Sequence, residues 1–392
     1  MRKEQFHLPE GVIYLDGNSL GPMPARAVTR MNQTLQEEWG EMLIRGWNDA
    51  GWMSQPVSLA DRVGALIGCP LGSVVLGDTL SVKVFQALSA ALAMRPDRKV
   101  ILSDTGNFPS DLYIAQGLIG SLEQDHRIKL VDPSDVEQNL SKDVAVLMLT
   151  QVDYRTGRMH DLQKITHAAH QHGIVVIWDL AHSAGAVPVD MSRSRAEFAI
   201  GCTYKYLNAG PGSPAFIYVR PDIVDQISPA LSGWLGHKAP FDFDLEYQPA
   251  PGIERMRVGT PPILQFAALD ASLSIWDGVS MQEVRERSIE LSELFICEVE
   301  KRCPEFELLS PRDPQQRGSQ VSFVFEHGYS VIRALIGQGV IGDFRAPNVM
   351  RFGIAPLYLD ESDIHAAVEI MQDIMQREIW KRPEFQIRAA VT

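Results

Sequence analysis

Two side chains with reactive potential follow apolar segments of this sequence. Asp179 ends the apolar run GIVVIWD, and Lys205 comes 26 residues later, between another apolar segment and the loop YLNAGPG. A strand-end aspartate is commonly a structural cap, and a lysine in a turn is usually solvated. A lysine that is desolvated beside an apolar segment can instead form a Schiff base with an aldehyde. The position of Lys205 therefore makes it a candidate nucleophile.

Asp179 and Lys205 together indicate one kind of cofactor. His182 follows Asp179 within DLAHSAG, where small residues leave room beside the chain. In open α/β sheets, ligands bind just outside the carboxyl ends of the strands, which is where these residues are expected. An aspartate can keep a pyridine nitrogen protonated and so preserve its capacity to accept electrons, while the lysine binds the aldehyde. The pair is typical of a pyridoxal phosphate site.

The phosphate of such a cofactor needs a helix N-terminus, where unpaired N–H groups and the helix dipole attract anions. The segment LGDTLSVKVFQAL supplies one, because Leu80 and Ser81 open an expected helix. Ser81 or Thr79 as a plain N-cap explains the same residues equally well and is compatible with phosphate binding. Phe108, in the loop NFPSD, is a candidate to stack on a cofactor ring, and burial in the core is the alternative interpretation.

The elements expected to position these residues alternate between strands and helices. Short, continuous apolar runs indicate strands buried on both faces, and the amphipathic runs between them indicate helices. Strands are expected at residues 73–76, 99–103, 128–131, 144–150, 174–179, 198–202 and 215–219, and helices at 57–67, 82–94, 111–122 and 162–172. This pattern predicts an α/β fold with a mostly parallel sheet covered by helices on both faces.

The pattern changes toward both ends of the chain. The first 50 residues are irregular, apart from a helical stretch expected at about residues 25–44. Beyond Pro262, one long helix is expected over residues 263–301, followed by a smaller α+β unit with strands at 306–309, 321–325 and 351–354 and helices at 329–337 and 361–377. We therefore divide the chain into an N-terminal segment at 1–50, a large domain at 51–260 and a small C-terminal domain at 261–392.

Composition excludes several classes of protein. The chain has 392 residues, of which 45% are hydrophobic and 22% charged, which is ordinary for a globular protein with a large core. Its formal net charge of −13 disfavours nucleic acid as a partner. The four cysteines form no CxxC pair and no metal-ligand spacing, so no metal is expected. Neither a signal peptide nor a membrane-length apolar run is evident, so we expect a soluble, cytoplasmic protein.

Seven motifs resemble, in sequence and in order, those of the kynureninase family, which belongs to the fold type I pyridoxal phosphate enzymes. They are YLDGNSLG at Tyr14–Gly21, NFPSD at Asn107–Asp111, WDLAHSAGAVP at Trp178–Pro188, CTYKYLNAGPG at Cys202–Gly212, GWLGH at Gly233–His237, RVGTPPIL at Arg257–Leu264 and MRFGIAPLY at Met350–Tyr358. Fold type I enzymes at large share the aspartate and the lysine. The motif NFPSD, the glycine loop and the late segment RFGIAPLY make the resemblance specific.

The resemblance implies a fold and an assembly. The fold would be that of the fold type I pyridoxal phosphate-dependent transferases, with a mostly parallel seven-stranded sheet sandwiched by helices and a smaller α+β domain at the C-terminus. The assembly would be a homodimer whose active sites lie at the subunit interface, with the N-terminal segment closing over each site. The cofactor would be pyridoxal 5'-phosphate.

Matching positions imply a role for each site residue. Catalysis is assigned to Lys205, which binds the cofactor covalently, to Asp179, which faces the pyridine nitrogen, and to Tyr204. The cofactor-binding set is Leu80, Ser81, Phe108, Asp111, Thr150, Asp179, His182, Tyr204, Lys205, Trp234 and Thr260, with Trp234 and Thr260 coming from the neighbouring subunit. The substrate-binding set is Asn18, Ser19, Trp47 and Arg351. The planar guanidinium of Arg351 would grip the substrate carboxylate.

The family's reaction is the hydrolytic cleavage of the Cβ–Cγ bond of L-kynurenine, or of 3-hydroxy-L-kynurenine, to anthranilate or 3-hydroxyanthranilate and L-alanine. It belongs to the kynurenine pathway of tryptophan catabolism, which also leads to NAD biosynthesis. From the expected place of its hydroxyl, we infer that Tyr204 donates a proton or holds an oxyanion. Animal relatives tend to have His near the position of Trp47 and Asn at that of Thr260, so this chain resembles bacterial members that prefer L-kynurenine.

Two alternatives share part of this evidence. A class V aminotransferase or a cysteine desulfurase would have the same fold, Asp179 and Lys205, but a desulfurase needs a reactive cysteine on a flexible loop. Cys297 and Cys303 instead fall in or at the end of an expected helix. A non-enzymatic binding module on the same fold is disfavoured, because Lys205, Asp179 and Arg351 are all retained.

Overall fold

The computed structural model describes residues 2–122 and 124–387. Its larger sheet has seven strands, in the order β4 (Val74–Leu76), β10 (Phe216–Val219), β9 (Phe198–Gly201), β8 (Val175–Asp179), β7 (Val144–Thr150), β5 (Val100–Asp104) and β6 (Arg127–Val131). Strand β10 is antiparallel to both of its neighbours, and every other neighbouring pair is parallel. The expected mostly parallel sheet is confirmed.

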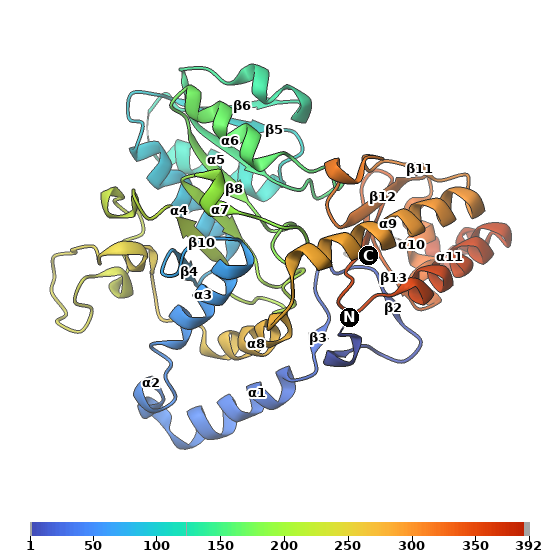
Figure 1. The fold of residues 1–392 in the computed structure, drawn as a ribbon, viewed down its shortest axis with the longest axis horizontal. Helices are drawn as coiled ribbons and strands as arrows, with labels where there is room; N and C mark the ends of the chain where they lie inside the picture. Colours follow the sequence, from blue (N-terminus) through green and yellow to red (C-terminus); the bar gives the residue numbers. More distant parts are fainter. Residues whose placement is uncertain (1, 123, 388–392) are drawn as a thin grey trace.

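Helices cover both faces of this sheet and form two separate cores. Helices α4 (Leu80–Ala93) and α5 (Pro109–Ser121) pack on one face, and α3 (Gln55–Leu66), α6 (Leu162–Gln171) and α8 (Ile263–Leu273) pack on the other (Figure 1). Because successive residues of a strand point to opposite faces, Val175 and Ile177 join the first core while Val176 and Trp178 join the second. Burial on both faces explains the continuous apolar runs in the sequence.

The smaller sheet is entirely antiparallel. Its strand order is β11 (Glu307–Leu308), β12 (Gln320–Val324), β15 (Val349–Gly353) and β14 (Asp343–Arg345). Helices α9 (Met281–Arg302), α10 (Gly328–Gly337) and α11 (Glu361–Gln376) lie beside it, and the short helix α12 (Pro383–Gln386) follows (Figure 1). The ring of Phe295, on α9, lies 6.0 Å from that of Phe323 and 5.1 Å from that of Phe352, which fixes α9 to β12 and β15.

The single helix expected over residues 263–301 is wrong, because the chain forms two helices there. Helix α8 ends at Leu273 and continues as a 3₁₀ turn, Ser274–Trp276. Backbone at Asp277 is extended and Gly278 has a φ of +72°, a conformation that favours glycine. Helix α9 then begins anew, with the Ser280 hydroxyl accepting from the N–H of Glu283. The break lets the chain pass from the large sheet to the small one.

The N-terminal segment is tied to the small sheet's side of the molecule. Strand β1 (Phe6–His7) pairs with β3 (Met23–Pro24), and β2 (Ile13–Tyr14) pairs in parallel with β13 (Val340–Ile341). The expected helix at 25–44 is interrupted, consisting of α1 (Ala27–Gln33), a π-helix at Thr34–Glu41 and a 3₁₀ turn at Leu43–Arg45 before α2 (Gly46–Asp49). The helical hairpin made by α1 and α2 extends away from both sheets (Figure 1).

The remaining elements are short. They are α7 (Met191–Ser194) and 3₁₀ turns at Lys3–Gln5, Pro133–Asp135, Glu137–Asn139, Val224–Gln226, Trp234–Gly236, Gly252–Met256, Pro314–Gln316 and Ile379–Lys381. Within residues 2–122 and 124–387, no helix has both the length and the hydropathy that crossing a membrane requires. Residue 1 and residues 388–392, which the expected first and last domains include, lie outside the described residues.

Candidate active site

Lys205 lies just beyond the end of β9, at the edge of the large sheet. Its Nζ is 3.0 Å from Nε2 of His182, 5.8 Å from the ring centre of Phe108 and 5.9 Å from that of Tyr204. Burial, reinforced by the nearby charge of Lys205, holds the pKa of His182 well below its ordinary value, so the imidazole is neutral at physiological pH. Within the described part of the chain, no carboxylate makes an ion pair with Lys205.

Asp179 and Asp111 form a buried, hydrogen-bonded carboxyl pair. Asp179 ends β8 and is 2% exposed, and Asp111 lies in the first turn of α5 and is 1% exposed. Burial and then the charge of Asp179 raise the pKa of Asp111 well above its ordinary value. Burial also raises the pKa of Asp179, but Lys205 and the N–H of Ala181, 2.8 Å from Oδ1, oppose that shift. The proton therefore lies on Asp111, and Asp179 is the anion of the pair.

Two helix N-termini converge beside this pair. The hydroxyls of Ser81 and Ser110, in the first turns of α4 and α5, are 3.4 Å apart. Neither N-cap residue, Thr79 for α4 or Phe108 for α5, accepts a hydrogen bond from its helix through a side chain. The first N–H groups of α4 are therefore open to an anion, whereas α5 offers fewer, because Pro109 has no N–H and the N–H of Asp111 donates to the carbonyl of Phe108. The expected phosphate position at Leu80 and Ser81 lies at this uncapped N-terminus.

Phe108 is 39% exposed and is held in place by Asn107. The Asn107 Oδ1 accepts from the N–H of Phe108 at 2.7 Å and from the hydroxyl of Thr150 at 2.5 Å, and its Nδ2 donates to Oγ of Ser103 at 2.9 Å. The ring of Phe108 meets that of Tyr154 edge to face, with centres 5.1 Å apart. Sequence reasoning assigned no role to Asn107, although its place directly before Phe108 in NFPSD was a signal.

Arg351 lies in β15 and is 1% exposed. Its Nε donates to Oδ1 of Asp343 at 2.6 Å, and its Nη2 donates to Oδ2 of the same carboxylate. On the other edge of the guanidinium, Nη2 lies 3.1 Å from Oγ of Ser19 and Nη1 donates to the carbonyl oxygen of Tyr154. Sequence reasoning missed Asp343 and Tyr154, because β14 is short and polar and Tyr154 lies in an irregular loop.

The N-terminal segment joins Arg351 to the loop that carries Lys205. Its Leu15 carbonyl accepts from the N–H of Gly353 at 2.7 Å, and its Gly21 N–H donates to the carbonyl of Tyr204 at 2.8 Å. Between these contacts, Nδ2 of Asn18 donates to Oε1 of Gln320 at 3.2 Å. The structure therefore brings Asn18 and Ser19 together with Arg351 and the lysine loop.

Three other expected residues lie elsewhere in the chain. Trp47, in α2, packs on Trp52 with ring centres 5.6 Å apart. Trp234 packs on Phe241 at 5.7 Å, and Thr260 lines a small hollow beside the N-terminal part of α4. Across residues 2–122 and 124–387, no hydrogen bond, ion pair or ring contact joins these three to Lys205 or Arg351. One chain by itself does not bring them into the site.

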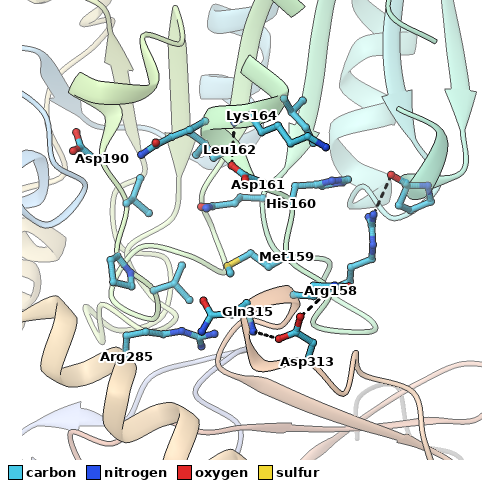
Figure 2. A pocket seen from close by; sticks show the side chains of 18 of the residues that line it. Arg158, Met159, His160, Asp161, Leu162, Lys164, Asp190, Arg285, Asp313 and Gln315 are labelled. Atoms are coloured by element: carbon cyan, nitrogen blue, oxygen red, sulfur yellow. Dashed lines mark hydrogen bonds between the residues drawn. The ribbon is translucent and has the colours of Figure 1, made fainter. Parts of the chain in front are cut away.

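A cavity of about 850 Å³ between α6 and α9 is separate from this site. Figure 2 shows Arg158, His160, Asp161 and Lys164 on one wall and Arg285, Asp313 and Gln315 on the other. Its charges find partners locally, since Lys164 pairs with Glu137 at 2.7 Å and Nη2 of Arg285 donates to the carbonyl of Arg317 at 2.6 Å. Neither Lys205 nor Asp179 lines it.

The converging residues fit pyridoxal 5'-phosphate. The uncapped N-terminus of α4 suits its phosphate, the Asp179 carboxylate its pyridine nitrogen, the Phe108 ring its flat face and the Lys205 amine its aldehyde. Two buried polar atoms, Oδ2 of Asp111 and Nδ1 of His182, have no hydrogen-bond partner among the described residues. Buried polar groups are rarely left unpaired, so these atoms mark a site that a polar ligand completes.

Two protein families match parts of the chain. The kynureninase C-terminal domain family matches residues 284–371, and the DegT/DnrJ/EryC1/StrS aminotransferase family matches residues 84–195. Kynureninases from Pseudomonas fluorescens and from Burkholderia pseudomallei (strain 1106a) are each 48% identical to this chain over 397 residues, which covers 100% of this chain and 95% of each relative.

Solved structures show the same architecture at low sequence identity. A cysteine desulfurase from Thermococcus onnurineus NA1 has a TM-score of 0.81 and 18% identity, covering 96% of this chain and 97% of its own. The cysteine desulfurase CsdA from Escherichia coli has a TM-score of 0.80 and 20% identity, covering 96% and 98%. These likenesses confirm the fold type I class, and the full-length relatives confirm a pyridoxal phosphate-dependent hydrolase. The chain belongs to the kynureninase family.

Proposed function

We propose that this enzyme cleaves the Cβ–Cγ bond of L-kynurenine with water, releasing anthranilate and L-alanine in tryptophan catabolism. One observation carries the proposal: a continuous set of contacts links the reactive amine to the carboxylate-binding arginine. Lys205 Nζ lies 5.8 Å from the Phe108 ring, Phe108 contacts Tyr154, and the carbonyl of Tyr154 accepts from Arg351. An α-amino acid can therefore present its amino group toward Lys205 and its carboxylate toward Arg351.

The cofactor, when bound, supplies an electron sink that stabilises negative charge developing on the substrate. Asp179 would keep the pyridine nitrogen protonated, since it is the ionised member of its pair with Asp111. Leu80 and Ser81 at the start of α4 would hold the phosphate, and Phe108 would cover the ring. Thr150 supports this arrangement through its hydrogen bond to Asn107.

Proton transfer is proposed to involve Lys205 and Tyr204. Once free, the Lys205 amine is the base placed to take the Cα proton of the substrate, with the neutral His182 at 3.0 Å adding no competing charge. Cys202 and burial raise the pKa of Tyr204, so its phenol keeps its proton at neutral pH. Tyr204 can thus donate a proton to Cβ after water has added to the Cγ carbonyl and the bond has broken.

The substrate's carboxylate is proposed to bind Arg351, with Ser19 and Asn18 completing that end of the site. A guanidinium offers two parallel N–H donors to a carboxylate, which fixes the orientation of an amino acid. We further propose that Trp47 and Thr260 give a preference for L-kynurenine over 3-hydroxy-L-kynurenine. An apolar indole and a small hydroxyl offer fewer partners for the extra ring hydroxyl than the polar residues of animal relatives.

We infer that the active enzyme is a homodimer. Among the described residues, Trp47, Trp234 and Thr260 make no contact with Lys205 of their own chain, as expected of residues that complete a neighbour's site. Apolar side chains are also exposed near two of them, including Ile44 at 77% and Phe243 at 74%. The proposed division at residues 50 and 260 would then give each chain a dimerising N-terminal segment, a cofactor domain and a domain carrying Arg351. We place the enzyme in the cytoplasm.

The fluorescence of released anthranilate tests the function directly. Purified enzyme loaded with pyridoxal phosphate should produce anthranilate from L-kynurenine, and faster than it produces 3-hydroxyanthranilate from the hydroxylated substrate. Lys205→Ala should abolish turnover, and Tyr204→Phe should lower kcat by about 10²-fold if Tyr204 is the proton donor. Absence of anthranilate would refute the proposal, and sulfide release from cysteine would indicate a desulfurase instead.

The structure disfavours the desulfurase alternative. Cys303 is buried at the end of α9, and Cys297 is exposed but lies within that long helix. Burial raises the pKa of the Cys303 thiol to about 12, which leaves it protonated and unreactive. A persulfide-forming cysteine must instead reach the substrate on a loop.

A further inference from the structure

Arg351 is held by a carboxylate on the next strand. Residues Asp343 and Arg351 face each other in the pairing of β14 with β15, and the carboxylate covers the edge of the guanidinium formed by Nε and Nη2. Because of this bidentate pair, the other edge of the guanidinium, formed by Nη1 and Nη2, faces Tyr154 and Ser19. Asp343 therefore determines which edge of Arg351 faces the substrate site.

A second carboxyl, Asp16, completes the cluster from the N-terminal segment. Its Oδ1 is shut off from solvent and has no hydrogen-bond partner among the described residues. The hydroxyl of Ser19 donates to Oδ2 of Asp343 at 2.7 Å, and the backbone N–H of Ser19 donates to the carbonyl oxygen of Asp16 at 2.9 Å. Arg345 approaches the same Asp343 oxygen at 2.9 Å. Two carboxyls and two guanidiniums thus lie in one cluster, in which the Ser19 hydroxyl bridges Asp343 and Arg351.

The other groups that face Asp16 do not carry a compensating charge. They are the phenols of Tyr14, Tyr206 and Tyr358, which come from β2, the lysine loop and the segment before α11. Burial and neighbouring groups raise the pKa of all three phenols, so they stay neutral. His182, whose pKa is lowered by burial and by the charges of Lys205, Arg351 and Arg345, also stays neutral. The charge balance of the pocket is therefore set by the two aspartates and the two arginines.

We propose that Asp343 positions Arg351 for substrate, and that Asp16 takes up one proton from solvent when the substrate carboxylate binds Arg351. This inference rests on the proposed function of Arg351. With both aspartates ionised, they balance the two arginines, so a third carboxylate would bring an uncompensated negative charge into a largely buried pocket. Protonating Asp16 removes that charge. Asp343 is unsuited to this task, because its direct pair with Arg351 depends on its ionised form.

The protonation equilibria of the free enzyme agree with this division. Burial, followed by the charge of Asp343, raises the pKa of Asp16 to about 7, against the opposing effects of Ser19, Arg351 and Arg345. The hydrogen bonds and charge of Arg351 outweigh burial and lower the pKa of Asp343. A bound carboxylate raises the pKa of Asp16 further, so binding and protonation favour each other. Affinity for a carboxylate should consequently fall as pH rises above about 7, where Asp16 of the free enzyme loses its proton.

Calorimetry with a ligand that keeps the carboxylate but lacks the α-amino group isolates this effect. The probe is 4-(2-aminophenyl)-4-oxobutanoate, which has no α-amino group to react with the cofactor's aldehyde. Titrations of the holoenzyme in buffers with different ionisation enthalpies count the protons taken up per ligand. We expect uptake to approach one proton above the Asp16 pKa, and Kd to rise by up to about tenfold per pH unit there.

The variant Asp16→Asn tests whether Asp16, and no other titrating group, takes up the proton. In D16N the proton uptake should fall by up to one per ligand, and Kd should stay near the wild-type value at low pH. Asp277→Asn, an exposed surface aspartate, is the matched control and should keep the wild-type behaviour. Asp343→Asn should raise KM for L-kynurenine by about tenfold while changing kcat less, and should shift the pH dependence downward because Asp16 loses a repelling neighbour.

Each outcome bears on the inference. It is overturned if the wild-type enzyme takes up no proton, if D16N keeps the wild-type pH dependence, if D343N leaves KM unchanged, or if the probe does not bind. The wild-type measurement needs no variant, so a misfolded D16N does not remove the test. An enzyme that releases anthranilate but takes up no proton keeps its proposed function and loses only this inference.

Discussion

Asp179 and Asp111 are both carboxyls, yet the structure gives them different tasks. In a buried pair, one shared proton removes the repulsion between two negative charges. The charge of Lys205 favours ionisation of both carboxyls, but only Asp179 also accepts from the N–H of Ala181, whereas Oδ2 of Asp111 has no hydrogen-bond partner among the described residues. Asp111 is therefore the protonated member of the pair, and Asp179 is the anion that we propose faces the cofactor.

This division predicts unequal effects of two matching substitutions. Asp111→Asn keeps a donor toward Asp179 and should lower kcat/KM for L-kynurenine by no more than about tenfold. Asp179→Asn removes the anion that is proposed to hold the pyridine nitrogen protonated and should lower kcat/KM by about 10³-fold or more. Steady-state kinetics on cofactor-loaded protein compares them. Equal losses in the two variants would mean that the pair does not have a fixed donor and a fixed anion.

Among the structural elements, the helix N-termini and the strand ends do most to assemble the site. Helices α4 and α5 begin side by side with uncapped first turns, and β8 and β9 deliver Asp179 and Lys205 to the same edge of the sheet. Parallel strands end at a common edge, so residues that follow them converge without further design. The position of these strand ends depends on α6, β8 and β10 keeping their places relative to one another.

Glu197 holds these three elements together, because it contacts His170 in α6, Val176 in β8 and Arg220 directly after β10. It accepts from Arg220 at 2.7 Å and from the N–H of Val176 at 3.0 Å, and it lies 3.1 Å from His170. Burial by itself would raise the pKa of Glu197, but His170, Val176 and Arg220 outweigh burial and lower it. A carboxyl whose pKa is lowered on folding stabilises the protein above its unfolded pKa, and that contribution is lost as pH falls through the folded value.

Glu197→Gln should accordingly destabilise the protein in a pH-dependent way. At neutral pH the variant should lose about 1–3 kcal/mol of unfolding free energy, because a buried cation and an N–H lose their charged acceptor. The difference from wild type should shrink as pH falls below 4.5, the ordinary glutamic acid pKa. Thermal unfolding followed by circular dichroism at several pH values measures it. A constant difference across that range would contradict an electrostatic origin.

At the scale of the whole molecule, apolar side chains are exposed on two segments that the proposed dimer would cover. Trp39, Leu43 and Ile44 on the N-terminal helical hairpin are 55%, 61% and 77% exposed, and Phe241 and Phe243 are 60% and 74% exposed. Exposed apolar side chains gathered in this way mark an interface more often than chance solvent exposure. Their proximity in sequence to Trp47 and Trp234 agrees with the proposed dimer.

A charge placed in this surface should separate the proposed dimer. Ile44→Asp should give a monomer in sedimentation measurements, because a buried carboxylate at an interface has no partner there. The monomer should stay folded but lose most anthranilate production, since Trp47, Trp234 and Thr260 would no longer complete a site. Leu71→Asp, at a residue 79% exposed ahead of β4, is the control and should remain a dimer with full activity. A monomeric wild-type enzyme with full activity would refute the dimer.

The amino-acid sequence alone predicted the order of most elements and the placement of Asp179 and Lys205 at the end of the sheet strands. Continuous apolar runs in the sequence correspond to strands that are buried on both faces of the sheet. The position of Asp179 and Lys205 after such runs predicted that both lie at one edge of the sheet. The motifs then indicated Arg351 and the family. These properties depend on local pattern, so neighbouring residues suffice to predict them. The break between α8 and α9 was not predicted, because the extended link between them is too short to interrupt the helical periodicity of the sequence visibly.

Only the tertiary structure decided how the charges of the site are balanced. Ser19 contacts Asp343 across 324 residues of sequence, and Arg351 contacts Tyr154 across 197. No local pattern predicts such contacts, because they arise when the N-terminal segment and β14 pack against β15. Burial then fixes protonation, placing a proton on Asp111 and leaving Asp16 poised between its two forms, since the free energy of a charge depends on its surroundings in space.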